Sequence, residues 1–219
     1  MMLPLHHILQ KYNVVPKGVI HVGSHFAQEH DEYLKMGVDY MVYIEPSKPT
    51  FEILLKKFGG KRDSIQDDGS RVVLFNLACG AEYLGMQPMN VSPFNEGQSN
   101  SLLSPHLHLE QHPEVKFTDT EMVEVQALDN LVIDYDKCNI IVADVQGYEL
   151  EVLKGGVGRL KKADAVYIEV NRDATYSGNA LIDDVDVFLL QHGFERVETY
   201  WPSPSWSWGD AIYIRKTLL

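Results

Sequence analysis

The segment VIHVGSHFAQEHDEY, residues 19–33, is the feature that most constrains the fold of this chain. Its apolar run VIHV suits a buried strand, and Gly23-Ser24 interrupts that run. From Ala27 onward the spacing of apolar residues becomes helical. A strand, a glycine turn and a helix in this order commonly open a doubly wound α/β domain that binds a nucleotide-like ligand above its first strand.

The turn also constrains the charge of that ligand. The third glycine of a dinucleotide fingerprint is absent, because His25-Phe26-Ala27 stands in its place. Glu29, Asp31 and Glu32 fall in the first turns of the helix, where acids suit the helix dipole but repel a pyrophosphate. A cationic ligand such as S-adenosylmethionine is compatible with them. The segment therefore favours a methyltransferase over a dehydrogenase.

The remaining apolar runs alternate with helical patterns, which is typical of an α/β protein with a mainly parallel central sheet. We expect one domain over residues 1–219, with a leading helix in residues 1–17 and an insert at 81–127 that contributes to the acceptor site. Beyond the first strand, the sequence predicts strands at residues 40–44, 72–75, 139–143, 165–168, 194–200 and 211–214.

Charge and composition exclude several classes of partner. The formal net charge of −12 argues against contacts with nucleic-acid phosphates or an anionic membrane surface. No apolar run approaches the length of a membrane span, and the N-terminus does not resemble a signal peptide. Cys79 and Cys138 follow apolar stretches and read as reduced thiols. We therefore expect a cytoplasmic protein that acts on a small molecule or glycan, and the sequence leaves its oligomeric state open.

Two strand ends carry residues suited to a nucleoside. Glu45 lies 22 residues after Gly23 (45 − 23), at the end of the second strand, where an acid can accept both ribose hydroxyls. The segment Asn76 to Cys79 ends the third strand with small residues that would make room for an adenine.

The insert contains a turn-rich segment at residues 92–101, followed by His106, His108 and His112. These histidines could be metal ligands, substrate contacts, the general base, or parts of a solvated loop. Asp129 is expected to cap a short helix within LDNLVIDY, residues 128–135.

The segment DVQGYELEVLKG, residues 144–155, resembles the D-x-[EQ]-G-x-E-x-x-V-L-x-G signature of the FkbM family of S-adenosylmethionine-dependent methyltransferases. The resemblance extends from about residue 17 to 215. Other matching pieces, in order, are the HVGSH opening, Ile44-Glu45-Pro46, the segment ending at Ser101, Leu128-Asp129, Ile168-Glu169-Val170 and Gly209-Asp210-Ala211.

This resemblance implies a class I methyltransferase (Rossmann-like) fold, with a doubly wound, mainly parallel seven-stranded sheet whose last strand is antiparallel. It implies methyl transfer, most often to a hydroxyl of a sugar or secondary metabolite. Two positions depart from many members, which carry Asp in place of His21 and Gly in place of Ala27.

The resemblance and the strand ends together predict the site. Asp144 is the first candidate for the general base, with Glu169, Asn171 and His106 as further catalytic candidates. Asp144, Glu169 and Asn171 are all oxygen donors that could hold Mg²⁺ or a similar cation. The predicted substrate-binding residues are Ser99, Ser101, Tyr176 and Trp206. The predicted cofactor-binding residues are His21, Gly23, Ser24, His25, Glu29, Glu45, Pro46, Ser47, Asn76, Ala78, Asp144, Gln146 and Gly147.

Two alternatives remain open at this point. An NAD(P)-dependent oxidoreductase would use the same opening element, although the missing third glycine and the acidic helix start argue against it. A non-catalytic nucleotide-binding module would keep the fold without the chemistry.

Overall fold

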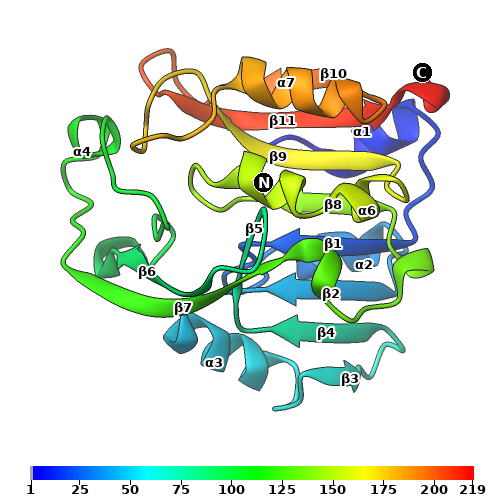
Figure 1. Cartoon of the computed structure of the whole chain (residues 1–219). Coiled ribbons are helices and arrows are strands. Elements are labelled where there is room, and N and C mark those ends of the chain that lie inside the picture. The colour runs from blue at the N-terminus through cyan, green and yellow to red at the C-terminus, as the bar shows by residue number, and fades with distance from the viewer. Residues whose placement is uncertain (1) are drawn as a thin grey trace.

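The computed structural model describes residues 2–219 and contains an eight-stranded main sheet in the order β10-β11-β9-β8-β1-β2-β4-β3 (Figure 1). Its parallel strands are β1 (Gly18–Val22), β2 (Tyr40–Ile44), β4 (Arg71–Phe75), β8 (Ile140–Ala143) and β9 (Ala165–Asn171). β11 (Trp208–Arg215) runs antiparallel to both β9 and β10 (Phe194–Tyr200). The predicted antiparallel last strand is therefore confirmed, within a mainly parallel α/β sheet.

One strand more than expected lies at the edge of this sheet. β3 (Asp63–Ile65) pairs antiparallel with β4, in a segment whose polar sequence predicts a loop. Its side chains are exposed or half-buried, so it carries no apolar run. This segment is a strand because its backbone pairs with β4.

The central strands are buried on both faces. Every residue of β1, β2, β8 and β9 is buried, which is why their sequences read as continuous apolar runs. Two separate hydrophobic clusters lie on the two faces of the sheet.

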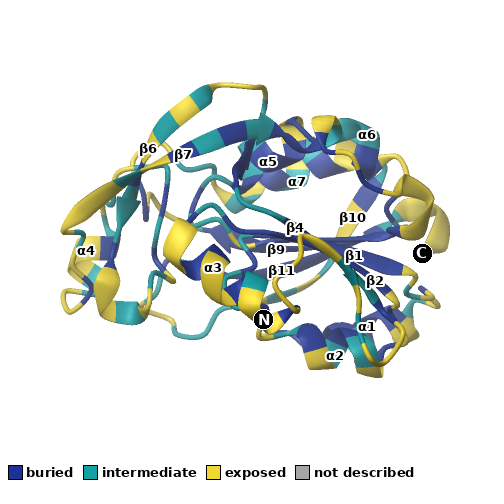
Figure 2. Cartoon of the chain, turned by 90° about the horizontal axis from the view of Figure 1, so that it is seen from below, coloured by how far each residue is buried: buried dark blue, intermediate teal, exposed yellow. Residues whose placement is uncertain are grey.

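Helices cover both faces, with α5, α6 and α7 on one side and α1 and α2 on the other (Figure 2). The cluster beneath the sheet takes residues from α1 (Leu5–Lys11), α2 (His30–Lys35) and α3 (Lys48–Lys57). The other cluster takes residues from α5 (Glu149–Lys154), α6 (Val157–Leu160) and α7 (Ile182–Gln191). The 3₁₀ helices are η1 (Pro93–Asn95), η2 (Leu128–Asn130), η3 (Tyr135–Lys137) and η4 (Lys216–Leu218).

Two strands of the insert, together with the short strand just before it, form a second sheet with the strand order β5-β7-β6. It comprises β5 (Ala78–Gly80), β6 (Gly85–Val91) and β7 (Asp119–Ala127), with α4 (His108–Gln111) between β6 and β7. Figure 1 shows β6, α4 and the first part of β7 beyond the carboxyl ends of β1, β2 and β4. The insert therefore lies at the edge where parallel α/β sheets bind ligands.

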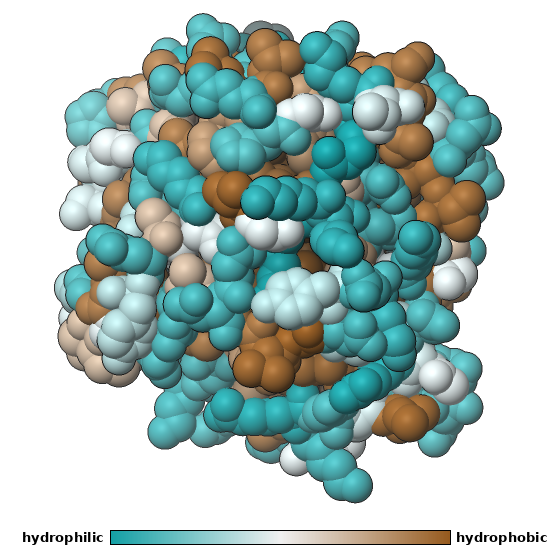
Figure 3. All heavy atoms as spheres, turned by 45° about the vertical axis from the view of Figure 1, so that its right-hand side comes forward, coloured by the Kyte–Doolittle hydropathy of each residue, from teal (hydrophilic) through white to brown (hydrophobic). Residues whose placement is uncertain are grey.

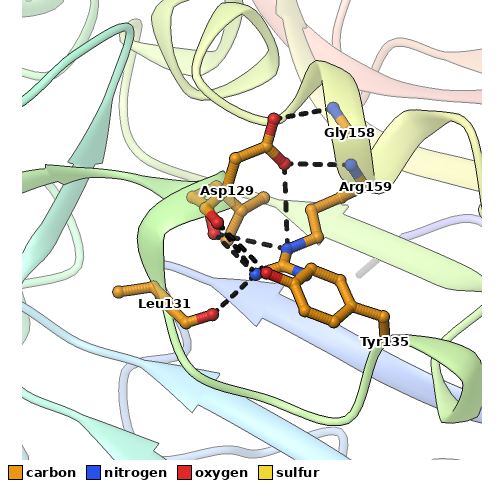
Figure 4. A network of polar contacts seen from close by, with 6 residues as sticks. Asp129, Leu131, Tyr135, Gly158 and Arg159 are labelled. Atoms are coloured by element: carbon orange, nitrogen blue, oxygen red, sulfur yellow. Dashed lines mark hydrogen bonds and ion pairs between the residues drawn. The ribbon is translucent and has the colours of Figure 1, made fainter.

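The prediction that Asp129 caps a helix in residues 128–135 is wrong. Figure 4 shows that its carboxylate instead accepts hydrogen bonds from the backbone N–H groups of Gly158, at 2.7 Å, and Arg159, at 3.0 Å. These groups belong to the start of α6, so Asp129 caps a helix that begins 28 residues later (157 − 129).

The Arg159 side chain completes this connection. Its guanidinium donates to the carbonyl oxygens of Leu128, Asp129 and Leu131, the last at 2.6 Å (Figure 4). It also lies over the Tyr135 ring, 3.2 Å from the ring centroid. The network therefore joins the segment after β7 to α6.

The surface seen in Figure 3 is mostly hydrophilic, and its apolar side chains appear in small separate groups. Within residues 2–219, no helix has both the length and the apolar character needed to cross a membrane.

Replacing Asp129 with Ala should lower the free energy of unfolding by about 1–3 kcal/mol, because two helix-start N–H groups lose their acceptor and the buried Arg159 guanidinium loses its ion-pair partner. Urea unfolding would measure this change. Asp136→Ala is the matched control, since its side chain is 82% exposed and its ion-pair partner among residues 2–219 is the exposed Lys162; we expect a change within about 0.5 kcal/mol. Equal losses in the two variants would contradict the capping role.

Candidate active site

A cavity of about 550 Å³ opens where the insert meets the carboxyl ends of the parallel strands. Its walls come from the turns after β1, β2, β8 and β9, from the start of β11 and from the insert. Its acidic lining residues are Glu29, Glu45, Glu114, Asp144, Glu169 and Asp210. No Lys or Arg occurs among the described residues that line it. The described cavity wall is therefore acidic.

The turn after β1 forms the floor of this cavity. The N–H groups of Gly23 and Ser24 both donate to the Ile44 carbonyl, at 2.9 and 3.0 Å. Gly23 has a φ of +75°, and a Cβ there would lie 1.8 Å from the Asp144 carbonyl oxygen. Only glycine fits this position.

Ala27, which stands where many members of the family carry glycine, also has a left-handed backbone, with a φ of +50°. The departure from the family pattern therefore keeps the conformation that glycine would favour. A non-glycine residue in this region costs roughly 1 kcal/mol.

Glu45 is held by backbone groups from both sides of the cavity floor. Its carboxylate accepts hydrogen bonds from the N–H groups of His25 and Ser47, each at 2.9 Å. Burial raises the pKa of Glu45 to about 7. Asn76 supports the same strand end, because its amide donates to the carbonyl oxygens of Glu45 and Pro46.

His21 is a buried, neutral member of the cavity wall. Burial lowers the pKa of His21 to about 4, and its Nδ1 lies 3.0 Å from the Tyr33 hydroxyl. At neutral pH it therefore lines the cavity as an uncharged hydrogen-bonding group, in contrast to the Asp that many members of the family have here.

Asp144, Glu149 and Glu169 gather at the ends of β8 and β9. Each places a carboxylate oxygen within 4.8 Å of the other two. Withdrawal from bulk water inside the cavity raises the pKa of Asp144 to about 6, although solvent reaches its side chain. Burial, together with the charges of Asp144 and Glu149, raises the pKa of Glu169 well above its usual range. Burial therefore disfavours the charged forms of both Asp144 and Glu169.

This carboxylate group does not fit a divalent cation as it stands. The amide nitrogen of Gln146 donates to Asp144 Oδ1 at 2.7 Å and to Glu169 Oε2 at 3.0 Å. Glu149 Oε1 already accepts the N–H groups of Val145 and Gly147. Asn171, the third predicted ligand, is buried and is not part of the cavity wall.

The insert contributes Ser99, His108 and His112 to the opposite wall. His108 is buried, with its Nε2 3.1 Å from the Ser99 hydroxyl, and burial lowers its pKa to about 4. The Trp208 indole donates to His112 Nε2 at 3.3 Å. This side of the cavity is thus aromatic as well as acidic.

The structure does not bring His106 to the cavity. Its ring is exposed, and its Nδ1 lies 3.1 Å from the Ala174 carbonyl oxygen. His108, two residues later, faces the cavity from the start of α4 instead.

The cavity brings together most of the predicted site residues. Those that line it are His21, Gly23, Ser24, His25, Glu29, Glu45, Pro46, Ala78, Ser99, Ser101, Asp144, Gln146 and Glu169. Those outside the wall are Ser47, Asn76, His106, Gly147, Asn171, Tyr176 and Trp206. Of the latter, Ser47, Asn76 and Tyr176 contact wall residues, and Trp206 stacks on Trp208.

Among the further wall residues are Glu114, Tyr148 and Asp210, which were not predicted as site residues. Asp210 pairs with Glu169 across β11 and β9. The match of Gly209-Asp210-Ala211 to the family was the only sequence signal for it.

Solved structures with the same architecture are class I methyltransferases. They include methyltransferase FkbM from Methylobacillus flagellatus KT, with a TM-score of 0.59 and 14% identity over 91% of this chain and 43% of that chain. They also include magnesium protoporphyrin IX methyltransferase from Synechocystis PCC 6803 with bound S-adenosylmethionine, with a TM-score of 0.53 and 10% identity over 96% of this chain and 76% of that chain. These likenesses establish a class I methyltransferase fold.

The family profile described as methyltransferase FkbM domain matches residues 21–196, so this chain belongs to the FkbM methyltransferase family. The 2-O-methyltransferase NoeI of Sinorhizobium fredii is 31% identical over 104 residues, which cover 45% of this chain and 43% of NoeI. The chain thus matches less than half the length of NoeI and of the Methylobacillus protein. The predicted family and fold class are confirmed.

The raised pKa of Glu45 predicts a pH-dependent stability difference between the protein and its Glu45→Gln variant. Between about 4.5, the ordinary pKa, and about 7, the native state binds more protons than the unfolded state. The free energy of unfolding therefore falls across this window relative to the variant, by up to about 3 kcal/mol, and levels off above it.

Denaturant unfolding of both proteins from pH 4 to pH 8, roughly the range in which such groups titrate, would measure this difference. A constant offset is expected in addition, because glutamine can accept only one of the two N–H bonds in the same way. Glu52→Gln, at an exposed position of α3, controls for the loss of one carboxylate. If the protein instead became more stable relative to the Glu45→Gln variant as the pH rises, this result would contradict a Glu45 pKa that burial raises.

Proposed function

We propose that this chain is an S-adenosylmethionine-dependent O-methyltransferase acting on a hydroxyl of a sugar, glycan or secondary metabolite. The observation that carries the proposal is the acidic cavity at the carboxyl ends of β1, β2 and β8, with no Lys or Arg in its described wall. Such a cavity attracts a ligand with a sulfonium and an ammonium group, and repels the pyrophosphate of a dinucleotide.

Each part of the cofactor has a matching part of the wall in this proposal. Gly23, Ser24 and His25 would lie along the methionine part, and Glu45 would accept the ribose hydroxyls. Ala78 and its neighbours would border the adenine. When bound, S-adenosylmethionine would supply an electrophilic methyl group on a positively charged sulfur.

Asp144 is the proposed general base. Its raised pKa of about 6 leaves it ionised at neutral pH, yet basic enough to take a proton from an attacking hydroxyl. Asp144 would accept the proton of the acceptor hydroxyl as its oxygen takes the methyl group, and the cofactor sulfur would keep the electron pair of the broken sulfur–methyl bond. Glu169, whose pKa burial raises well above its usual range, would help to orient Asp144 through Gln146.

The acceptor side supports a neutral polyhydroxylated substrate. His112 and Trp208 offer aromatic surfaces against which a sugar ring can pack, and Ser99 and Ser101 offer hydroxyls. The likeness to NoeI, a 2-O-methyltransferase, supports transfer to oxygen. The net charge of −12 supports a small-molecule or glycan acceptor rather than a nucleic acid.

The two cysteines, Cys79 and Cys138, are free and buried, which is consistent with a reducing compartment. We therefore include a cytoplasmic location in the proposal.

Calorimetric titration with S-adenosylmethionine should show binding that weakens about 10- to 100-fold in Glu45→Ala, because the ribose hydroxyls lose an ionisable acceptor. Glu52→Ala, exposed on α3, is the matched control. NAD⁺ serves as the competing ligand. Binding of NAD⁺ in preference to S-adenosylmethionine would overturn the proposal.

Methyl transfer from a radiolabelled donor to a panel of glycans should fall by about 10²- to 10⁴-fold in Asp144→Asn, since the hydroxyl loses its base. Asp31→Asn, at an exposed position of α2, controls for the change of charge. Full activity of the Asp144 variant would show that another group takes the proton.

A further inference from the structure

Gln146 lies at the centre of the polar contacts of the site. It belongs to the turn after β8, and its amide nitrogen donates to Asp144 at 2.7 Å and to Glu169 at 3.0 Å. An amide has two N–H donors, so both carboxylates are served by one side chain. Without this group, two neighbouring carboxylates would face each other in a site withdrawn from water.

The rest of Gln146 is bound to the insert and to the loop after β9. The Tyr176 hydroxyl lies 2.9 Å from Gln146 Oε1 and 3.2 Å from the Ser99 carbonyl oxygen. The Ser101 hydroxyl donates to the Gln146 carbonyl at 2.7 Å. Gln146 therefore connects the acidic pair to the element that forms the acceptor wall.

The backbone at Gln146 is unusual for a residue with a side chain. Its φ is +57°, in the left-handed region that glycine adopts without strain. Strained residues of this kind occur at functional sites, where the surrounding structure holds them in place. Here the amide contacts at the far end of the side chain give a physical reason for a glutamine at this position.

The carboxylates of Asp144, Glu149 and Glu169, all within 4.8 Å of one another, form a set of oxygen donors of the type that Mg²⁺ and Ca²⁺ bind. In this chain the partially positive amide hydrogens of Gln146 lie against two of the three. An amide donor and a metal ion cannot occupy the same position between Asp144 and Glu169.

We propose that the Gln146 amide takes the place of a divalent cation and is the positioning group of the site. It holds Asp144 against Glu169 through Asp144 Oδ1 and connects both carboxylates to the insert. Its consequence for catalysis rests on the proposed function, whereas its exclusion of a cation does not.

Two substitutions test this role through cation binding. Gln146→Gly removes the amide and accepts the φ of +57° without strain, so it should fold. Gln146→Glu replaces the amide with a further carboxylate. For both variants, the melting temperature should rise when CaCl₂ or MgCl₂ is added after treatment with EDTA. The rise should be larger for Gln146→Glu.

The unsubstituted protein should show no such rise, and neither should Gln87→Glu, which makes the same change of charge at a half-buried position of β6 outside the cavity wall. A rise in the unsubstituted protein equal to that of the Gln146 variants would overturn the proposal, because a cation would then displace the amide. Absence of a rise in Gln146→Gly and in every folded Gln146 variant would overturn it too.

Titration of the EDTA-treated, unsubstituted protein with S-adenosylmethionine keeps the two proposals apart. Failure to bind this ligand would remove the proposed function and leave the cation result unaffected. If a cation instead improved the binding of S-adenosylmethionine to the unsubstituted protein, this result would contradict the role of Gln146 and leave the proposed function standing.

Discussion

The close contact between the turn after β1 and the end of β8 is the constraint on which the rest of the site depends. A Cβ on Gly23 would lie 1.8 Å from the Asp144 carbonyl oxygen, while the Asp144 N–H donates to Val22 at 3.0 Å. One side of the contact leads to Ser24 and His25, and the other leads to Asp144 and Gln146. The two halves of the cavity wall are therefore held together by backbone, before any side chain is considered.

On this framework the protein gathers carboxylates at a cost to its own stability. Glu45, Asp144 and Glu149 have pKa values raised to about 7, 6 and 7, because burial disfavours their charged forms. Backbone N–H groups and the Gln146 amide offset part of this cost. A cationic ligand would offset more of it, since it favours the ionised forms. The same acids that weaken the empty fold thus favour the proposed cofactor.

Local sequence patterns were sufficient where a residue's surroundings come from its own strand or turn. The apolar run at residues 40–44 coincides with β2, and Glu45 follows it directly into the cavity wall. The same local patterns did not predict the contacts of polar residues whose partners lie far away along the chain. β3 has no apolar run, and Asp129 caps α6, whose first residue lies 28 positions further along the chain. His106 was preferred over His108 because the sequence does not show which of these rings, at the start of α4 or just before it, faces the cavity.

The sequence by itself determined the α/β class, the family, and the strand ends at which the functional residues stand, because apolar periodicity and the signature at residues 144–155 are properties of contiguous chain. Tertiary structure alone decided which polar groups meet. It brought Gln146 between Asp144 and Glu169, joined Tyr176 to Ser99, and placed Asp210 beside Glu169. These pairings depend on strand order and on the fold of the insert, and no local pattern encodes the distance between side chains so far apart in the chain.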